Sequence, residues 1–391
     1  MKDNQAKYPQ LRFKGFTDPW EERKLSAAVD NIGTGKSKYM LQEKSDLAKY
    51  EVLGSTSVIG YDEDYDHEGD FILTARVGAN AGNLYHHSGK VKITDNTVFI
   101  QGKNLAFIYN LLTQFNLKKL SFGTGQPLVK ASELKNLILY FPNNDEQAKI
   151  GSYFKQLDHL ITLHQRKLDL LKEQKKGYLQ KMFPKNGAKV PKLRFAGFAD
   201  DWEERKLSDV ANHRGGTAIE KYFDKDGVYK VISIGSYGLN SQYVDQNIRA
   251  ISNEITDGRV VNSGELTMVL NDKTANGSII GRTLLVEKDN EYVINQRTEI
   301  ISPKENFDSN FAYTILNGPF REKVKRIVQG GTQIYVNYPA VSNLDLELPK
   351  IEEQQKIGSF FKQLDDTIAL HQRKLDLLKE QKKGFLQKMF V

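Results

Sequence analysis

Hydrophobic side chains recur with an average period of 3.5 residues along two long segments of the chain. In residues 145–183, two series that each step by seven start at Ile150 and Phe154, and both return in residues 352–391. A sustained heptad period is typical of helices that pack along one another as a coiled coil. The pattern predicts two long helices whose contacting stripe, the seam, consists of Ile150, Phe154, Leu157, Ile161, His164, Leu168, Leu171, Ile357, Phe361, Leu364, Ile368, His371, Leu375 and Leu378.

The two helical segments are near copies of each other. Residues 150–183 and 357–390 are identical at 29 of 34 positions, and residues 9–26 return, slightly changed, as 191–208. Duplication of this kind indicates pseudo-twofold symmetry within one polypeptide. Two equivalent helices related by a twofold axis perpendicular to their length run antiparallel. We therefore expect an intramolecular antiparallel coiled coil about 57 Å long, at roughly 1.5 Å per residue.

Polar residues interrupt the seam at matching places in both copies. His164 and Lys175 stand in the first helix, and His371 and Lys382 stand at the equivalent positions of the second. Polar seam residues usually specify register at some cost in stability. Metal binding by His164 and His371 would need further ligands, which the sequence does not offer. His86 and His87 are adjacent in sequence, and such tandem histidines cannot easily bind the same ion. We predict no metal site.

Between the repeats lie two segments of low mutual similarity, residues 27–144 and 209–351. Both have short β-rich runs, glycine-containing turns and one helical stretch, so the fold class is expected to be mixed α/β (α+β) with two globular domains. Residues 1–26 and 184–208 form repeated lead segments, the second joined to a linker. Strands are predicted at 71–77, 90–100, 228–234, 265–270, 278–287 and 299–302, and helices at 105–115 and 310–328.

Composition and charge narrow the class of protein. No cysteine occurs among the 391 residues, which excludes disulfides, thiolate zinc sites and a cysteine nucleophile. No apolar run approaches the roughly 20 residues that span a bilayer, and no signal peptide is evident, so a cytoplasmic protein is expected. The net charge of +7 resides in the two repeated helices. Six acidic residues crowd into Asp62–Asp70, and this loop should face away from any phosphate backbone.

The repeats carry a family resemblance. The duplicated helices with KLDLLKEQKKG and LQKMF, the WEERKLS segments and the two glycine-threonine-glutamine turns occur in the same order in both halves. In this organisation the chain resembles the specificity subunit of a type I restriction-modification system along essentially its whole length. The resemblance implies a DNA-binding, non-catalytic protein with two target-recognition domains, each of which binds half of a split, asymmetric target in double-stranded DNA.

The resemblance also implies partners and cofactors. The helices would set the distance between the half-sites and bind two methyltransferase (modification) subunits, which in turn allow two motor-nuclease (restriction) subunits to join. S-adenosylmethionine, ATP and magnesium would then belong to those subunits, and none of them to this chain. From spacing alone, inserting four residues into both helices should lengthen the gap by one or two base pairs.

Candidate DNA contacts fall on loops that follow strands or the lead segments. Glycines let a main chain approach phosphates, while Asn, Gln and Arg side chains pair with base edges. The resemblance places the glycine-threonine-glutamine turns near DNA; alternatively, these turns only connect elements, and the charged loops are only solvated. The candidates are Lys36, Lys38, Tyr39, Arg76, Asn80, Asn83, Thr124, Gly125, Gln126, Arg214, Gly216, Thr217, Lys221, Asn271, Lys273, Thr274, Asn276, Gly331, Thr332 and Gln333.

The sequence lacks the motifs of the relevant enzymes. No Asn-Pro-Pro-Tyr or Asp-Pro-Pro-Tyr occurs for amino-methyl transfer, and no Gly-x-x-x-x-Gly-Lys-Ser/Thr occurs for an ATP-driven motor. Glu22 and Lys24 imitate half of a nuclease site, but they recur in a repeated segment where surface ion pairs are the simpler interpretation. The alternative to a DNA-binding protein is a two-headed coiled-coil scaffold that joins other proteins.

Overall fold

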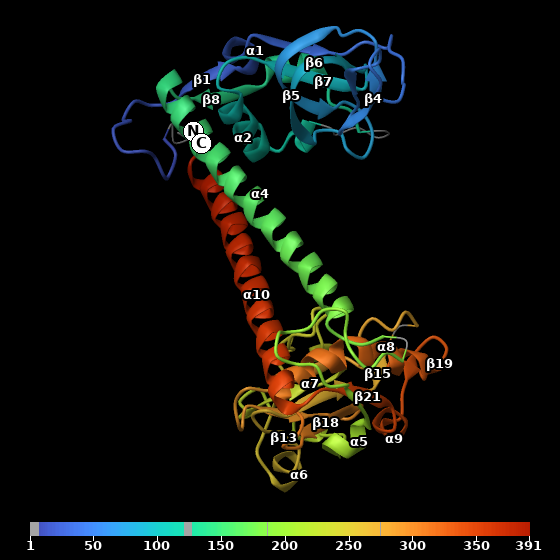
Figure 1. Ribbon diagram of the computed structural model, residues 1–391. Coiled ribbons are helices and arrows are strands. Elements are labelled where there is room, and N and C mark those ends of the chain that lie inside the picture. Colours follow the sequence, from blue (N-terminus) through green and yellow to red (C-terminus); the bar gives the residue numbers. More distant parts are fainter. Residues whose placement is uncertain (1–7, 121–126, 186, 274) are drawn as a thin grey trace. The chain divides into compact units, whose positions relative to one another are not determined.

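The computed structural model describes residues 8–120, 127–185, 187–273 and 275–391. It divides into two compact units, residues 1–166 with 372–391 and residues 167–371. Each unit contains one mixed α/β domain together with part of helix α4 (Asn144–Lys181) and part of helix α10 (Ile351–Lys388) (Figure 1). The long helices are therefore not segments apart from the domains, because each unit includes a portion of both.

The first domain is organised around a six-stranded sheet. The strand order is β2-β7-β5-β6-β3-β4, with bounds Asn31–Thr34, Thr97–Gln101, His67–Ala75, Leu84–Ile93, Tyr50–Leu53 and Val58–Asp62. A separate two-stranded sheet joins β1 (Glu21–Lys24) to β8 (Ile138–Phe141). The helical elements are α1 (Leu25–Ala28), α2 (Leu105–Phe115), a 3-10 turn (Leu117–Leu120) and α3 (Ala131–Asn136).

The second domain spreads its strands over more sheets. Its central sheet has the order β10-β18-β14-β16, with bounds Ala211–Gly215, Thr298–Pro303, Leu266–Val269 and Thr283–Leu285. A second sheet is β12-β11-β17-β13 (Arg249–Ala250, Tyr229–Ile232, Tyr292–Ile294 and Val260–Val261). A third is β15-β20-β19 (Asn271–Asp272, Ile334–Tyr335 and Gln329–Gly330), and β21 (Asp345–Leu348) pairs with β9 (Glu203–Lys206).

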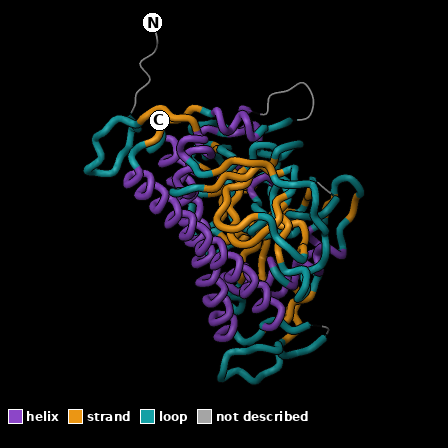
Figure 2. Tube along the Cα trace, turned by 90° about the horizontal axis from the view of Figure 1, so that it is seen from above, coloured by secondary structure: helices purple, strands orange, loops and turns teal. Residues whose placement is uncertain are grey.

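Short helices connect these strands, and apart from the long helices much of the chain is strand and loop (Figure 2). The helical elements of the second domain are α5 (Leu207–Val210), 3-10 turns at Glu220–Tyr222 and Ile234–Ser236, α6 (Glu254–Asp257), α7 (Ser309–Asn317), α8 (Pro319–Arg326) and α9 (Tyr338–Ser342).

The tryptophans of the lead segments anchor each domain to helix ends. Trp20 is 1% exposed, and its ring centroid lies 5.9 Å from that of Phe107 on α2 and 6.2 Å from that of Phe390 beyond α10. Trp202 packs in the same way against Phe183, at 6.0 Å. Large aromatic side chains contribute heavily to core stability. Both tryptophans are therefore core residues that join a lead segment to helix ends.

Within each unit the two long helices pack antiparallel. In the first unit Ile150 and Phe154, near the start of α4, share a core with Met389 at the end of α10. In the second unit the start of α10 meets the end of α4, where Phe361 packs against Phe183. Eight of the predicted seam residues are buried: Ile150, Phe154, Leu157, Leu168, Leu171, Ile357, Phe361 and Leu375. The other six are half-buried: Ile161, His164, Leu364, Ile368, His371 and Leu378.

The predicted seam lysines reach carboxylates on the opposite helix. Lys175 Nζ lies 2.5 Å from Asp365 Oδ1, and in the other unit Lys382 Nζ lies 2.5 Å from Asp158 Oδ1. The two pairs occupy equivalent positions of the duplicated helices. Since each pair joins one helix to the other, it favours one register of the antiparallel packing.

Reversing one of these charges should cost stability that a second reversal restores. We expect Lys175→Glu to destabilise the second unit by about 1 kcal/mol and Lys175→Glu with Asp365→Lys to recover most of it, because both groups are partly shielded. Chemical denaturation of the four proteins in the cycle measures the coupling. Lys176→Glu is the matched control, since Lys176 pairs only distantly with Glu173, at 3.9 Å on an exposed face. A coupling energy of zero would contradict the expectation.

Three predicted elements differ from the structure. Residues 90–100 are not one strand but the end of β6 and the start of β7, separated by a turn in which Thr97 donates to the Thr94 carbonyl. The helix predicted at 310–328 is divided into α7 and α8, because Pro319 cannot donate the hydrogen bond that would continue α7. In the run 278–287 only Thr283–Leu285 is a strand.

Candidate nucleic-acid interface

Two of the predicted loops of the second domain leave its central sheet at the same end. β10 and β14 both pair antiparallel with β18, and Gly215 and Met268 lie opposite the same residue, Glu299. The two strands therefore run in the same direction, one strand apart, and end on the same side. The loops that begin at Gly216 and Leu270 therefore start on either side of the residues that precede β18.

A third predicted cluster joins these loops through a small sheet. β15 (Asn271–Asp272) pairs with β20, and β20 pairs with β19 to form a hairpin. Gly331, Thr332 and Gln333 form the exposed tip of this hairpin. The glycine-threonine-glutamine turn and the loop after β14 are thus neighbours, although about 60 residues separate them. Lys273 and Asn276 are exposed on this loop, and Thr274 lies outside the described residues.

The first domain repeats this arrangement with different side chains. β2 and β5 flank β7, and Thr34 and Thr74 both lie opposite Val98. The loops that carry the candidates from Lys36 and from Arg76 therefore leave the sheet at the same end. Val77 forms a bridge with Leu128, which corresponds to the contact between β15 and β20 in the second domain. Thr124, Gly125 and Gln126 lie outside the described residues.

The candidate loops of the first domain are braced by their own hydrogen bonds. Arg76 is half-buried and donates from Nη1 to the Asp95 carbonyl at 3.2 Å. Asn83 Nδ2 donates to Asn80 Oδ1 at 3.1 Å. The Lys36 main chain donates to the Ile93 carbonyl, while its side chain is exposed. Lys38 is exposed and Tyr39 half-buried.

Two charged candidates of the second domain already have partners within the protein. Arg214 Nη2 donates to both carboxylate oxygens of Glu265, at 2.9 and 2.8 Å. The ammonium of Lys221 lies 4.7 Å from the ring centroid of Tyr222. Lys221 remains exposed at its loop, whereas the Arg214 guanidinium would have to share its ion pair in order to contact a phosphate.

Gly216, one of the predicted DNA contacts, has a packing role in the structure. A Cβ at this position would lie 2.0 Å from the Asn295 carbonyl oxygen, and one at the equivalent Gly35 would lie 2.1 Å from that of Ile93. No side chain tolerates such a distance to main chain, so glycine is required for the strand end to pass the following turn. Thr217, next along the chain, forms a bridge with Asn295.

A turn in the middle of each candidate surface is absent from the predicted contacts. Gln296 and Arg297 are exposed in the turn before β18, between the loops that follow β10 and β14. Leu270, which begins the loop after β14, donates its main-chain N–H to the Arg297 carbonyl. The equivalent turn of the first domain, residues 94–96, was hidden inside a predicted strand. Aligning ITDNT with INQRT as two polar turns between β-rich runs could have identified both.

The acidic cluster lies at the other end of β5 from Arg76, but Asp62 and Asp66 accept hydrogen bonds from the Met40 and Ile93 N–H groups, which lie beside the other candidate segments. Asp62–Asp70 precedes and begins β5, whereas Arg76 follows its last residue. Burial alone raises the pKa of Asp62, but hydrogen bonds from the Met40 N–H and the Lys92 ammonium outweigh it and hold the pKa at about 2. The Asp62 charge is thus held inside the domain by Lys92 and by the main chain just after the candidates Lys38 and Tyr39.

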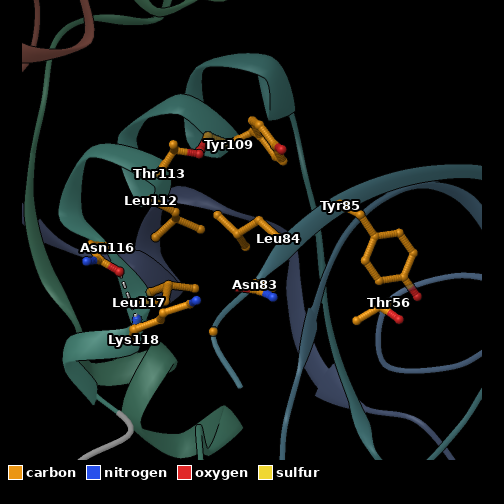
Figure 3. A pocket seen from close by; sticks show the side chains of 11 residues that line it. Thr56, Asn83, Leu84, Tyr85, Tyr109, Leu112, Thr113, Asn116, Leu117 and Lys118 are labelled. Atoms are coloured by element: carbon orange, nitrogen blue, oxygen red, sulfur yellow. Dashed lines mark hydrogen bonds between the residues drawn. The ribbon is translucent and has the colours of Figure 1, made fainter. Parts of the chain in front are cut away.

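A pocket of about 470 Å³ borders the candidate loop of the first domain (Figure 3). Asn83 and Tyr85 line it on one side, and Tyr109 and Thr113 of α2 line it on the other. Lys118 is the one charged residue among the described residues of its lining. The pocket therefore offers amide, hydroxyl and aromatic groups, without paired acids or bases for proton transfer.

No group of three or more His, Asp or Glu side chains in the described part of the chain is placed to hold a metal ion. Among the helices of residues 8–120, 127–185, 187–273 and 275–391, none is both long and apolar enough to cross a membrane.

Known proteins resemble this chain in sequence and in fold. The specificity subunit of the type I restriction enzyme MjaVIII of Methanocaldococcus jannaschii is 27% identical over 333 residues, which cover 81% of this chain and 77% of that protein. The putative MjaX specificity subunit of the same organism is 22% identical over 432 residues, covering 94% of this chain and 92% of the relative. The crystal structure of the S subunit of a type I restriction-modification system from M. genitalium matches with a TM-score of 0.69 at 15% identity, covering 98% of this chain and 99% of that one.

A family model, the type I restriction modification DNA specificity domain, matches residues 17–173 and again residues 199–380. Each match spans one domain together with most of the long helix that follows it in sequence. Because the two matches cover most of the chain, this protein belongs to the type I restriction modification DNA specificity domain family.

Proposed function

We propose that this chain is the non-catalytic specificity subunit of a type I restriction-modification complex, and that each domain reads one half of a bipartite, asymmetric target in double-stranded DNA. The observation that carries the proposal is the repeated surface at one end of each central sheet. In both domains the loops after two parallel strands and the turn between them meet there. The side chains differ between the domains, as reading two different half-sites requires.

The chemistry of this surface suits base and phosphate contacts. In the second domain the exposed residues include Asn276, Arg297 and Gln333, whose side chains have the groups that pair with adenine or guanine edges in the major groove. Exposed Lys273 and Lys221 can contact phosphates, which fixes orientation without reading sequence.

The long helices carry a second hydrophobic stripe suited to protein partners. Leu163 and Leu170 of α4 are 46% and 52% exposed, and the equivalent Leu370 and Leu377 of α10 are 61% and 59% exposed. Exposed leucines at a seven-residue spacing favour contact with another protein. Because the stripe occurs once on each helix, it supports two methyltransferase subunits, with two motor-nuclease subunits joining them. S-adenosylmethionine, ATP and magnesium would bind to those subunits.

The test is to purify the chain with its methyltransferase subunit and to map methylated sites in DNA from cells that express both. The proposal expects two unlike half-sites separated by a fixed gap, and binding of a duplex that contains both. Methylation at a contiguous site, or equal binding to scrambled duplexes, would refute it. A protein scaffold without DNA specificity would bind the target duplex and the scrambled duplexes equally.

Arg297, which is exposed in the turn before β18, allows a direct test of whether this turn contacts DNA. Arg297→Ala should weaken binding to the parental duplex by about 1–3 kcal/mol, the usual value of one specific base contact, and should relax specificity at one position of the second half-site only. Competition binding with duplexes altered one base pair at a time measures both effects. Arg205→Ala, on the exposed strand β9, is the control and should leave binding unchanged. Unaltered affinity in Arg297→Ala would remove this residue from the interface.

A further inference from the structure

Arg321 of α8 is a buried arginine that binds main chain. It is 7% exposed, and its guanidinium donates to the carbonyl oxygens of Gly277, Ser278 and Ile280 at 2.9, 2.8 and 2.9 Å. Burial lowers the pKa of Arg321 to about 10, and the nearby Arg282 lowers it in the same direction. Burying a charge costs free energy unless the charge is hydrogen-bonded. All three hydrogen bonds that offset this cost go to one loop, so Arg321 fixes the conformation of that loop.

The same loop is held from its other side. The Asp272 carboxylate, on a residue only 3% exposed, accepts a hydrogen bond from the Ile279 N–H at 2.8 Å. Arg282 Nε donates to the Ser278 carbonyl at 2.9 Å. Asn276 is exposed immediately before these fixed residues, and its Oδ1 accepts a hydrogen bond from the Ser278 N–H. The anchors are therefore buried while the adjoining amide side chain is presented outward.

The equivalent loop of the first domain needs no such arginine. Main-chain hydrogen bonds close the loops at residues 75–82 and 269–281, and the second loop is the longer. The shorter loop is also closed internally, because Ala81 donates to the Gly78 carbonyl. The longer loop has an internal main-chain bond as well, from Arg282 to the Ile279 carbonyl, and Arg321 adds three donors to it from outside.

We infer that Arg321 is a positioning residue for the second half-site: it fixes residues 277–280 so that Asn276 is held in one orientation toward DNA. The inference rests on the proposed function and adds a residue that does not itself reach the DNA surface. Discrimination between DNA sequences by the second domain then depends partly on α8, although Arg321 is more than 40 residues from this loop along the chain.

The test uses the complex with the methyltransferase subunit and two sets of duplexes, each altered by single base pairs in one half-site. Arg321→Met should lower discrimination in the second half-site about tenfold and leave the first half-site unchanged. Arg321→Lys keeps the charge but loses the planar fork, so a smaller loss in the same half-site is expected. Lys325→Met, on the same helix but paired with Glu322, is the control and should behave as the parent.

Asn276→Ala separates positioning from simple loss of structure. If Arg321 acts through Asn276, the double variant should discriminate no worse than the more affected single variant. Parental discrimination in folded Arg321→Met, or equal loss in both half-sites, overturns the inference. Should Arg321→Met not fold, parental discrimination in Arg321→Lys overturns it instead. Failure of the proposed function is seen separately, as absence of split-site discrimination in the parental complex.

Discussion

Replacing Arg12 by methionine is expected to destabilise the first unit by about 3–5 kcal/mol, the typical cost of removing one partner from a buried ion pair. Arg12 Nε and Nη2 each lie 2.7 Å from a carboxylate oxygen of Glu146, whose side chain is 0% exposed. The Glu146 hydrogen bond and charge raise the pKa of Arg12, so the guanidinium stays charged. Without it, the first turn of α4 would bury a carboxylate that has lost its cation.

The two tryptophans make this measurement specific to one unit. Trp20 lies in the core of the first unit and Trp202 in that of the second, so Trp202→Phe leaves a fluorescence signal from the first unit alone. In that background, Arg12→Met with Glu146→Gln should recover most of the lost stability, because the carboxylate charge is removed. Arg23→Met is the control, since its pair with Glu21 is exposed and worth little. A loss below 1 kcal/mol in Arg12→Met would show that Glu146 finds another partner.

Because the lead segment is duplicated, replacing Arg194 should destabilise the second unit as replacing Arg12 destabilises the first. Arg194 Nε and Nη2 contact Glu353 at 2.7 and 2.8 Å, and the Glu353 side chain is 1% exposed. The main chain repeats the contact as well, because Leu11 donates to the Lys388 carbonyl and Leu193 donates to that of Lys181. Each lead segment thus binds the end of one long helix and the start of the other.

Periodicity and duplication were sufficient to predict what the hydrophobic residues do. The helix expected at 105–115 is α2, Leu105–Phe115, and the long helices start and end within a few residues of the expected bounds. In these elements burial decides the conformation, and burial leaves a periodic signal in the sequence. The predicted seam rests on the same signal.

Elements without a hydrophobic period escaped prediction. β1 and β9, both with the sequence EERK, are exposed at every residue and are strands only because β8 and β21 pair with them. Pairing over more than 100 residues leaves no local pattern. For the same reason the sequence could name the loops at 271–276 and 331–333 but could not show that β15 and β20 place them together.

The candidate surface depends on strand register even more strongly. Arg297 is an ordinary turn residue in the sequence, and it becomes central only because β10, β18 and β14 align their ends. Arg321 lies in an amphipathic helix whose other basic residues are half-buried (Lys323 and Lys325) or exposed (Arg326), so only the folded structure distinguishes it from a solvated charge. Sequence differences between the domains therefore locate the variable surface, whereas the contacts that shape it come from the fold.

The largest functional effect is expected from lengthening both long helices together. α4 and α10 each run from one compact unit into the other, with the unit boundaries after Arg166 and after His371. Four residues inserted at both boundaries add about 6 Å of helix, close to two base-pair rises of 3.4 Å. Methylation should move to targets with a gap longer by one or two base pairs, and the parental target should lose most of its methylation.

Insertions in one place only provide the controls for this prediction. Four residues added to α4 alone should impair folding or activity, because they shift one helix by about a turn relative to the other and misalign the pair of Lys175 with Asp365. Four residues added between the exposed Gly187 and Ala188 lie outside both helices and should leave the gap unchanged. Site mapping by sequencing methylated DNA distinguishes the three variants. An unchanged gap in the doubly lengthened protein would mean that the spacing of the half-sites is set by the bound partners rather than by α4 and α10.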